Sequence, residues 1–210
     1  MATTPYTTSG ASGFGIKEVA DVGFYEVGTV TVDSQTGAIT SGTPLFVLDT
    51  LKVSTIENTA EQADAKGGKG NAPLIIWDYG REITITLQDA VLTQETLSMM
   101  FENNAEGNVK GNPNEIVISA NTFPGTYSIV GKTFARGMDG KDSLFTWYVP
   151  KAKVNSEVTL TMEAEGDPTV FDMNLRVLRD SDGTMVKLIR DTSDGANATA
   201  LAYDPTKDFA

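Results

Sequence analysis

The sequence contains neither cysteine nor histidine. Without cysteine there is no disulfide, no thiolate zinc site and no cysteine nucleophile, so packing and hydrogen bonds alone must hold the fold. Without histidine the chain lacks the commonest general base and the commonest transition-metal ligand of proteins. Both absences disfavour an enzyme, and we expect no catalytic residue, no cofactor and no metal ion.

Basic residues are scarce beside acidic ones. The chain has 16 lysines and arginines against 28 aspartates and glutamates, a formal net charge of −12. This charge disfavours a surface that grips nucleic acid or an anionic membrane. It is compatible with DNA that passes alongside, because neutralised phosphates would create affinity and drag, whereas weak repulsion would not.

Long hydrophobic runs are missing too. No segment approaches the roughly 20 apolar residues that span a bilayer, and MATTPYTTSGASGFG has neither the basic nor the apolar region of a secretion signal. We therefore expect a protein that is cytosolic where it is made, and we interpret the NAT triplet at 197–199 as a chance match to a glycosylation acceptor. The ordinary content of apolar (40%) and charged (21%) residues predicts one domain at 16–190, between arms at 1–15 and 191–210.

What is present is mostly the pattern of β-strands. Ile83, Ile85 and Leu87 alternate with polar residues, a period typical of a half-buried strand. Phe171, Met173, Leu175 and Val177 repeat the pattern and are expected to face inward. Thr93 is placed to cap one short helix, QETLSMMF, and 138–143 and 180–183 carry Asp-Gly turn chemistry. Strands are predicted at 24–33, 44–54, 74–89, 115–120, 126–135, 143–154, 156–165, 169–180 and 185–190, the last closing a hairpin. The fold class is mainly β: an antiparallel β-sandwich or barrel with one short flanking helix, a long inter-strand loop and extended terminal arms.

The KGGKG run at 66–70 invites a comparison with phosphate-binding loops. That pattern requires GxxxxGK, then serine or threonine, then a helix. Here Lys69 is followed by Gly70 and an apolar strand. GFGIKE at 13–18 fails likewise as a dinucleotide motif, because Glu18 stands where a third glycine is required. Neither run predicts a cofactor.

Segment 55–72 is therefore interpreted as a long loop with another role. Ser54 and Glu57 have capping-box spacing, and Glu57, Glu61 and Asp64 would share one face of a helix. Hairpin loops take about 2–5 residues, and longer excursions commonly bind a partner. A plain surface loop stays the alternative.

Carboxylates are numerous enough to allow a glycosidase-like acid and base pair. Nearly all of them, however, fall on outward strand faces or in turns, where solvation explains them. A calcium loop is also disfavoured, since the spacing of its candidate ligands lacks the alternating pattern and the distal glutamate. Those candidates are Asp180, Asp182, Asp191, Asp194 and Asn197.

Two long stretches carry a family resemblance: ENTAEQADAKGGKGNAPLIIWDYGREITITLQDA, followed by the short helix, and SLFTWYVPKAKVNSEVTLTMEAEGDPTVFDMNLRVLRD. Together, over about residues 16–190, the chain resembles the tail tube (major tail) proteins of long-tailed bacteriophages. The resemblance implies a β-sandwich with a flanking helix, hexameric rings that stack into a hollow tube, and a loop at 55–72 that contacts the neighbouring ring. It also implies a place in the virion tail after assembly in the host bacterial cytoplasm. The expected partners are further copies of the chain, terminator, baseplate and tape-measure proteins, and a sheath protein in a contractile tail.

The residues fit such an assembly. Acidic groups followed by basic ones make a bipolar surface suited to a head-to-tail contact that propagates. The expected intersubunit residues are Glu57, Glu61, Asp64, Lys66, Gly67, Gly68 and Lys69, and the aromatic residues Trp77, Tyr79, Trp147 and Tyr148 belong either to such contacts or to the core.

The predicted function is therefore structural: a tail tube whose negatively charged bore conducts genomic DNA without binding it specifically. A tail terminator or baseplate hub protein of similar fold is the first alternative. A carbohydrate-binding β-sandwich, which needs exposed aromatic residues in one platform, is the second. A hydrolase is least favoured.

Overall fold

The computed structural model describes residues 13–16, 21–89, 91, 93–101, 120–121, 123–138, 140–155 and 171–191. Its elements are β1 (Phe14–Ile16), β2 (Asp21–Glu26), β3 (Thr31–Val32), β4 (Ile39–Ser41), β5 (Phe46–Leu48), β6 (Leu51–Gly67), β7 (Ala72–Asp89), α1 (Gln94–Phe101), β8 (Thr126–Gly137), β9 (Asp142–Val154), β10 (Phe171–Val177) and β11 (Lys187–Arg190). The fold is thus mainly β and antiparallel with one short helix among the described residues, as predicted. The predicted strands at 115–120 and 156–165 and the two predicted arms lie outside this part of the chain, except for residues 13–15, 120 and 191.

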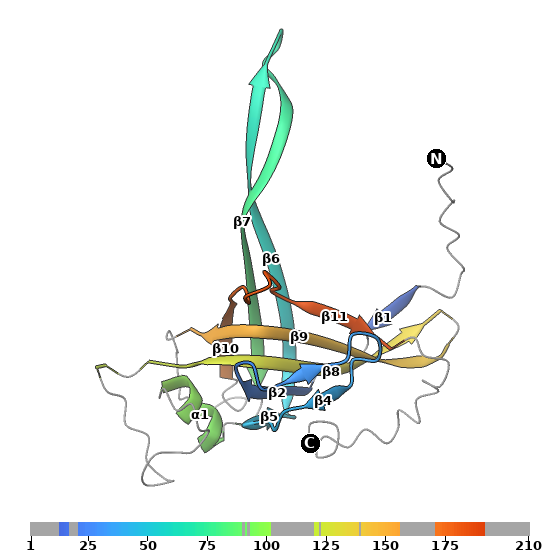
Figure 1. Ribbon diagram of the computed structural model, residues 1–210, viewed down its shortest axis with the longest axis vertical. Coiled ribbons are helices and arrows are strands. Elements are labelled where there is room, and N and C mark those ends of the chain that lie inside the picture. The colour runs from blue at the N-terminus through green and yellow to red at the C-terminus, as the bar shows by residue number, and fades with distance from the viewer. Residues whose placement is uncertain are drawn as a thin grey trace, which may run out of the picture.

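One large antiparallel sheet carries most of these strands (Figure 1). Its order is β5-β2-β8-β9-β10-β7-β6, with β1 added to β8 and β11 added to β9, while β3 and β4 form a separate hairpin. The prediction that 185–190 closes a hairpin with the preceding strand is wrong. The C-terminal end of β10 already pairs with β7 on one edge and with β9 on the other, so β11 pairs with β9 instead.

Two predicted strands are interrupted by turns. The run 24–33 divides at 27–29, where the Thr29 N–H bonds to the Glu26 carbonyl (3.2 Å) and Gly28 has a φ of +83°. The run 44–54 divides at 49–50, between β5 and β6. The first interruption is a turn that falls within an alternating run, so periodicity alone does not locate it, whereas the second falls at the polar pair Asp49 and Thr50.

The main core joins residues from β2, β5, β7, β8, β9, β10 and α1. Ile83, Ile85 and Leu87 of β7 are buried there, and so are Met173 and Leu175 of the neighbouring β10. Their alternate neighbours are only partly buried or exposed. The predicted inward faces of these two strands are confirmed.

The helix begins where its cap was predicted. The Thr93 hydroxyl oxygen accepts a hydrogen bond from the Thr96 N–H (3.2 Å), and the Leu97 N–H bonds to the Thr93 carbonyl (3.1 Å). These contacts satisfy backbone groups that the first helical turn leaves without partners. Met99 and Met100 then bury one side of the helix in the main core.

The other face of β2, β8 and β9 carries a second, smaller core. Tyr25, Val130 and Tyr148 pack there with Val30, beside the β3–β4 hairpin. Asp33 shapes the turn of that hairpin, because its carboxylate accepts the N–H groups of Thr36 (2.8 Å) and Gln35 (2.9 Å). Both hydrogen bonds lower the pKa of Asp33, and the one from the Thr36 N–H has the larger effect.

Candidate assembly surface

A long hairpin of β6 and β7 projects from the rest of the molecule (Figure 1). The two strands pair from Leu51 opposite Asp89 to Gly67 opposite Ala72. The predicted loop at 55–72, with its helical acidic stripe, is therefore wrong: the segment is strand as far as Gly67. As a strand, this segment pairs its backbone N–H and C=O groups with those of β7. A short acidic helix that packs against nothing would be less stable than this pairing.

The KGGKG run provides the turn of this hairpin. Gly68 and Gly70 have φ values of +77° and +92°, and Asn71 has a φ of +50°. The Asn71 N–H bonds to the Gly68 carbonyl (3.2 Å). A Cβ at either glycine would meet no atom within 4 Å, so glycine serves backbone conformation here and not space.

A bulge separates the outer part of the hairpin from its base. The register shifts between Thr59, opposite Glu82, and Glu61, opposite Tyr79, which leaves an additional residue in β7. Gly80 lies at this point with a φ of +61°. Such bulges bend a ribbon and increase its twist. We call the part beyond the bulge, Glu61–Gly67 and Ala72–Tyr79, the arm.

The two faces of the arm differ in chemistry. Residues paired directly across an antiparallel ladder share a face. One face, which we call the apolar arm face, consists of Glu61, Ala63, Ala65, Ile75, Trp77 and Tyr79. Its three large apolar side chains are each 53% exposed. The opposite face is mixed: the Gln62 side-chain amide donates to Asp78 (2.9 Å) and Lys66 lies 3.7 Å from Asp64, but Ile76, opposite Asp64, is also 55% exposed.

The predicted acidic stripe is consequently divided. Glu61 lies opposite Tyr79, whereas Asp64 lies opposite Ile76, so the two carboxylates are on different faces of the arm. Glu57 lies below the bulge, opposite Thr84. Their expected role in intersubunit contacts stays a prediction, but the shared helical face that motivated it does not exist.

The four predicted aromatic residues fall into two places. Trp77 and Tyr79 are on the arm, whereas Trp147 and Tyr148 are buried in the two separate cores. Trp147 lies opposite Gly131, where a Cβ would be only 2.0 Å from its ring. The four side chains therefore do not form one platform, and only Trp77 and Tyr79 share an exposed face.

A groove of about 740 Å³ lies at the base of the hairpin, and sequence analysis did not identify it. Its walls come from β7, β9 and β10, and its cationic residues are Arg81, Lys153, Arg176 and Arg179. Glu82, whose carboxylate is 3.0 Å from Arg176, is the only carboxylate among the described residues that line it. A two-carboxylate hydrolytic site is thus not present in this groove. Lys153 and Arg176 are neighbours only through strand register, which spacing in sequence does not reveal.

The far end of the sheet holds a third feature, built on β1. Phe14 and Ile16 lie opposite Gly137 and Ala135 of β8. The Phe14 ring is 5.9 Å from that of Phe145, and the Arg190 guanidinium lies 4.7 Å from the Phe14 ring centre. β1 therefore attaches residues of the predicted N-terminal arm to the sheet.

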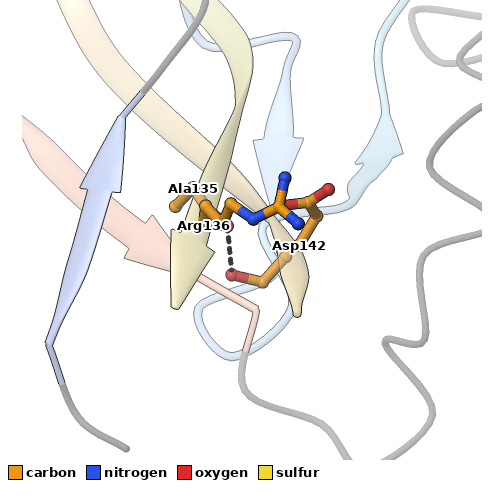
Figure 2. A network of polar contacts seen from close by, with 4 residues as sticks. Ala135, Arg136 and Asp142 are labelled. Atoms are coloured by element: carbon orange, nitrogen blue, oxygen red, sulfur yellow. Dashed lines mark hydrogen bonds and ion pairs between the residues drawn. The ribbon is translucent and has the colours of Figure 1, made fainter. Parts of the chain in front are cut away.

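Side-chain hydrogen bonds join β11, β9 and β8 at this end of the sheet. The Arg190 Nε donates to the Ser143 hydroxyl (3.0 Å), which donates to the Ala135 carbonyl (3.3 Å). Figure 2 shows this region, with Arg136 beside Asp142, whose charged groups are 3.8 Å apart. Both side chains of that pair are largely exposed, so solvent screens it.

Of the candidate calcium ligands in the described part of the chain, Asp180 and Asp182 lie in a turn, whereas Asp191 follows β11 and its N–H bonds to the Leu144 carbonyl (2.9 Å). The Asp180 N–H bonds to the Thr184 carbonyl (2.9 Å), and the Gly183 N–H bonds to the Asp180 carbonyl (3.0 Å). Gly183 has a φ of +80°. This geometry agrees with the turn chemistry predicted from DSDG. Asp194 and Asn197 lie outside the described residues.

Comparison with known proteins identifies a family. No curated protein matches the chain. Among its described helices none is long and apolar enough to cross a membrane. The model of the YomU/Tube protein family matches residues 14–106 and 104–190. That family's name points to a structural component of a phage tail, in agreement with the resemblance seen in the sequence. The matched segments span most of the 210 residues, and the chain belongs to the YomU/Tube protein family.

Proposed function

We propose that this protein is a tail tube subunit that assembles into stacked hexameric rings. The observation that carries the proposal is the apolar arm face. A two-stranded ribbon alone is at best marginally stable in water, yet this one extends Ile75, Trp77 and Tyr79 into solvent, each 53% exposed. Burial of such a side chain from full exposure contributes roughly 1.5–3 kcal/mol, and assembly would supply about the half that remains exposed here.

The shape of the molecule favours a polymer over a closed pair. The arm projects in one direction from the body, so a neighbour must receive it on a different surface. A contact between unlike surfaces is heterologous, and it either closes a ring or propagates. In this proposal rings close laterally, the arm joins one ring to the next, and the resemblance to tail tube proteins supplies the number six.

The polar face of the sheet suits a bore through which DNA passes. Between β7 and β10, the Thr86 hydroxyl donates to Asn174 and the Gln88 amide donates to Asp172, both at 2.9 Å. These two donors are already occupied, so they offer little to phosphates, and the bore lining proposed here leaves out the neighbouring groove with its four cations. Together with the net charge of −12, they support a conduit that does not retain the genome.

Electron microscopy of the purified chain tests the proposal. The unmodified protein is concentrated and viewed by negative stain, with sedimentation velocity on the same samples. Hollow tubes or stacked six-fold rings are the expected result. A variant carrying Trp77→Asp and Tyr79→Asp should remain a folded monomer, with an unchanged circular dichroism spectrum.

Two outcomes would contradict the tube assignment. Stable single rings that never stack would favour a tail terminator or baseplate hub protein. A monomer that persists at all concentrations, even with preformed tube fragments added as seeds, would exclude self-assembly.

A further inference from the structure

We propose that the apolar arm face of one copy docks on a second surface of the next copy, at the β1 end of the sheet. We call this surface the β1 platform, and it consists of Phe14, Ile16, Leu188 and Arg190. The inference rests on the proposed function and deepens it, because it names the surface that receives the arm.

Strand register places these four side chains on one face. In β11, Leu188 lies opposite Trp147 and Arg190 lies opposite Phe145, so both share the face of β9 that includes buried Trp147. Phe14 reaches the same face, since its ring contacts that of Phe145. Ile16 follows Phe14 by two residues in β1 and is on the same side.

This face of β9 continues beyond the segment that pairs with β10. β10 pairs with β9 only at 152–154, whereas β11 pairs with it at 145–148. Leu188 is 62% exposed, Ile16 53% and Phe14 45%. The platform is therefore an apolar continuation of the core face that this copy leaves open to solvent.

The arm and the platform are complementary. The apolar arm face offers three large apolar groups and one carboxylate, Glu61, and its two alanines leave the ring of Trp77 prominent. The platform offers three apolar groups and one cation, Arg190, held by Ser143. Apolar burial would supply the affinity, and a contact between Glu61 and Arg190 would fix the register.

The groove at the base of the hairpin is the rival receiver. It gathers four cations and would attract the acidic residues of an arm. Docking there would place Ile75 and Tyr79 against guanidinium and ammonium groups. These apolar side chains would remove water from the cations without replacing it by a carboxylate, which is unfavourable. On the β1 platform, Glu61 of the arm would meet Arg190, and the apolar side chains of the arm would meet apolar side chains.

Cysteine cross-linking distinguishes the two receivers, since the natural chain has no cysteine. In a chain carrying Ile75→Cys and Leu188→Cys, each copy would link to the next, and oxidation under assembly conditions should give a ladder of covalent oligomers on a non-reducing gel. Ile75→Cys with Arg179→Cys, in the groove, and Ile75→Cys with Thr40→Cys, on exposed β4, should give dimers at most. A ladder from the Arg179 pair, or equal ladders from all three, would overturn the inference.

A charge swap tests the proposed register. Glu61→Arg and Arg190→Glu should each raise the critical concentration for assembly about tenfold, equivalent to about 1.4 kcal/mol, and the double variant should restore it. Glu26→Arg makes the same charge change at an exposed position opposite Tyr127, at the other end of β8 from β1, and should shift the value less than twofold. Thermal unfolding of each variant verifies that the Arg190 change leaves the body folded.

These outcomes separate the inference from the proposed function. Tubes that form normally without a Leu188 ladder and without charge-swap rescue would remove the β1 platform and leave the tube assignment standing. Failure of the unmodified chain to assemble, even when seeded, would remove both.

Discussion

The two halves of β7 show how one strand serves two environments. In the body, Ile83, Ile85 and Leu87 are almost fully buried, with exposures of 7%, 0% and 1%. In the arm, Ile75 and Trp77 are of similar apolar character but are each 53% exposed. Folding of one copy buries the first group. The second group has the same tendency to leave water, but the described part of this copy leaves it half exposed.

The bulge at Gly80 is the boundary between these two regimes. Below it, β7 has β6 on one side and β10 on the other, and beyond it the described pairs of β7 are with β6 alone. The left-handed φ of Gly80 and the shifted register change the direction of the ribbon at the point where support from the body ends. The backbone thus separates the part that packs within one copy from the part that we propose assembles.

The largest expected effect contrasts an isoleucine in each half. Ile85→Ala should reduce the free energy of unfolding of the monomer by about 2–5 kcal/mol, because it leaves a cavity in the main core. Ile75→Ala should change it by less than about 0.5 kcal/mol, as expected for an exposed position. Urea denaturation under non-assembling conditions measures both values, and equal losses would show that the arm packs on its own body.

A glycine in the body is expected to have the next largest effect. The Gly131 Cα faces the Trp147 ring so closely that a Cβ would lie 2.0 Å from it. Gly131→Ala should therefore force the indole to move and cost about 1–3 kcal/mol of stability. Trp147 fluorescence should shift to the red with it. An alanine that costs nothing would mean that the core around Trp147 is loosely packed.

The sequence predicts these body elements well, since their signals are local. Alternation in 83–88 and 173–177 identified the buried faces of β7 and β10, and Thr93 identified the start of α1. Each of these signals depends on neighbours within a few residues, where secondary structure imposes its own period.

The β6 side of the arm was not predictable by the same reasoning. Residues 57–67 of β6 are mostly polar or small and have no apolar period, so only their pairing with β7 makes them a strand. The capping-box spacing of Ser54 and Glu57 predicted a helix that this pairing overrides. Register also brings Lys153 beside Arg176, and Leu188 to the face of Trp147, across long sequence separations. Partner choice between strands is a tertiary property that periodicity does not encode.

A glycine in the arm turn should have a smaller and more local effect than Gly131. Gly68 has a φ of +77° but open space around its Cα, so Gly68→Ala should cost about 1 kcal/mol through backbone conformation alone. We expect faster amide hydrogen exchange at residues 62–67 and 72–78, with no change in the body. Gly68→Asn should be milder, since asparagine tolerates this conformation. A uniform increase in amide hydrogen exchange across the body would instead show that the arm and the body unfold as one cooperative unit.

The smallest expected effect concerns the ion pair at the root of the arm. The Arg176 Nε and the Glu82 carboxylate are 3.0 Å apart, but their side chains are 66% and 47% exposed, so water and salt screen the attraction. A double-mutant cycle with Glu82→Gln and Arg176→Gln should give a coupling below about 1 kcal/mol that decreases in high salt. A larger, salt-independent coupling would show that the pair fastens the arm to the body. A small one means that the ladder and the bulge set the direction of the arm without this ion pair, which would leave its apolar face free to adjust to the neighbouring copy in the proposed assembly.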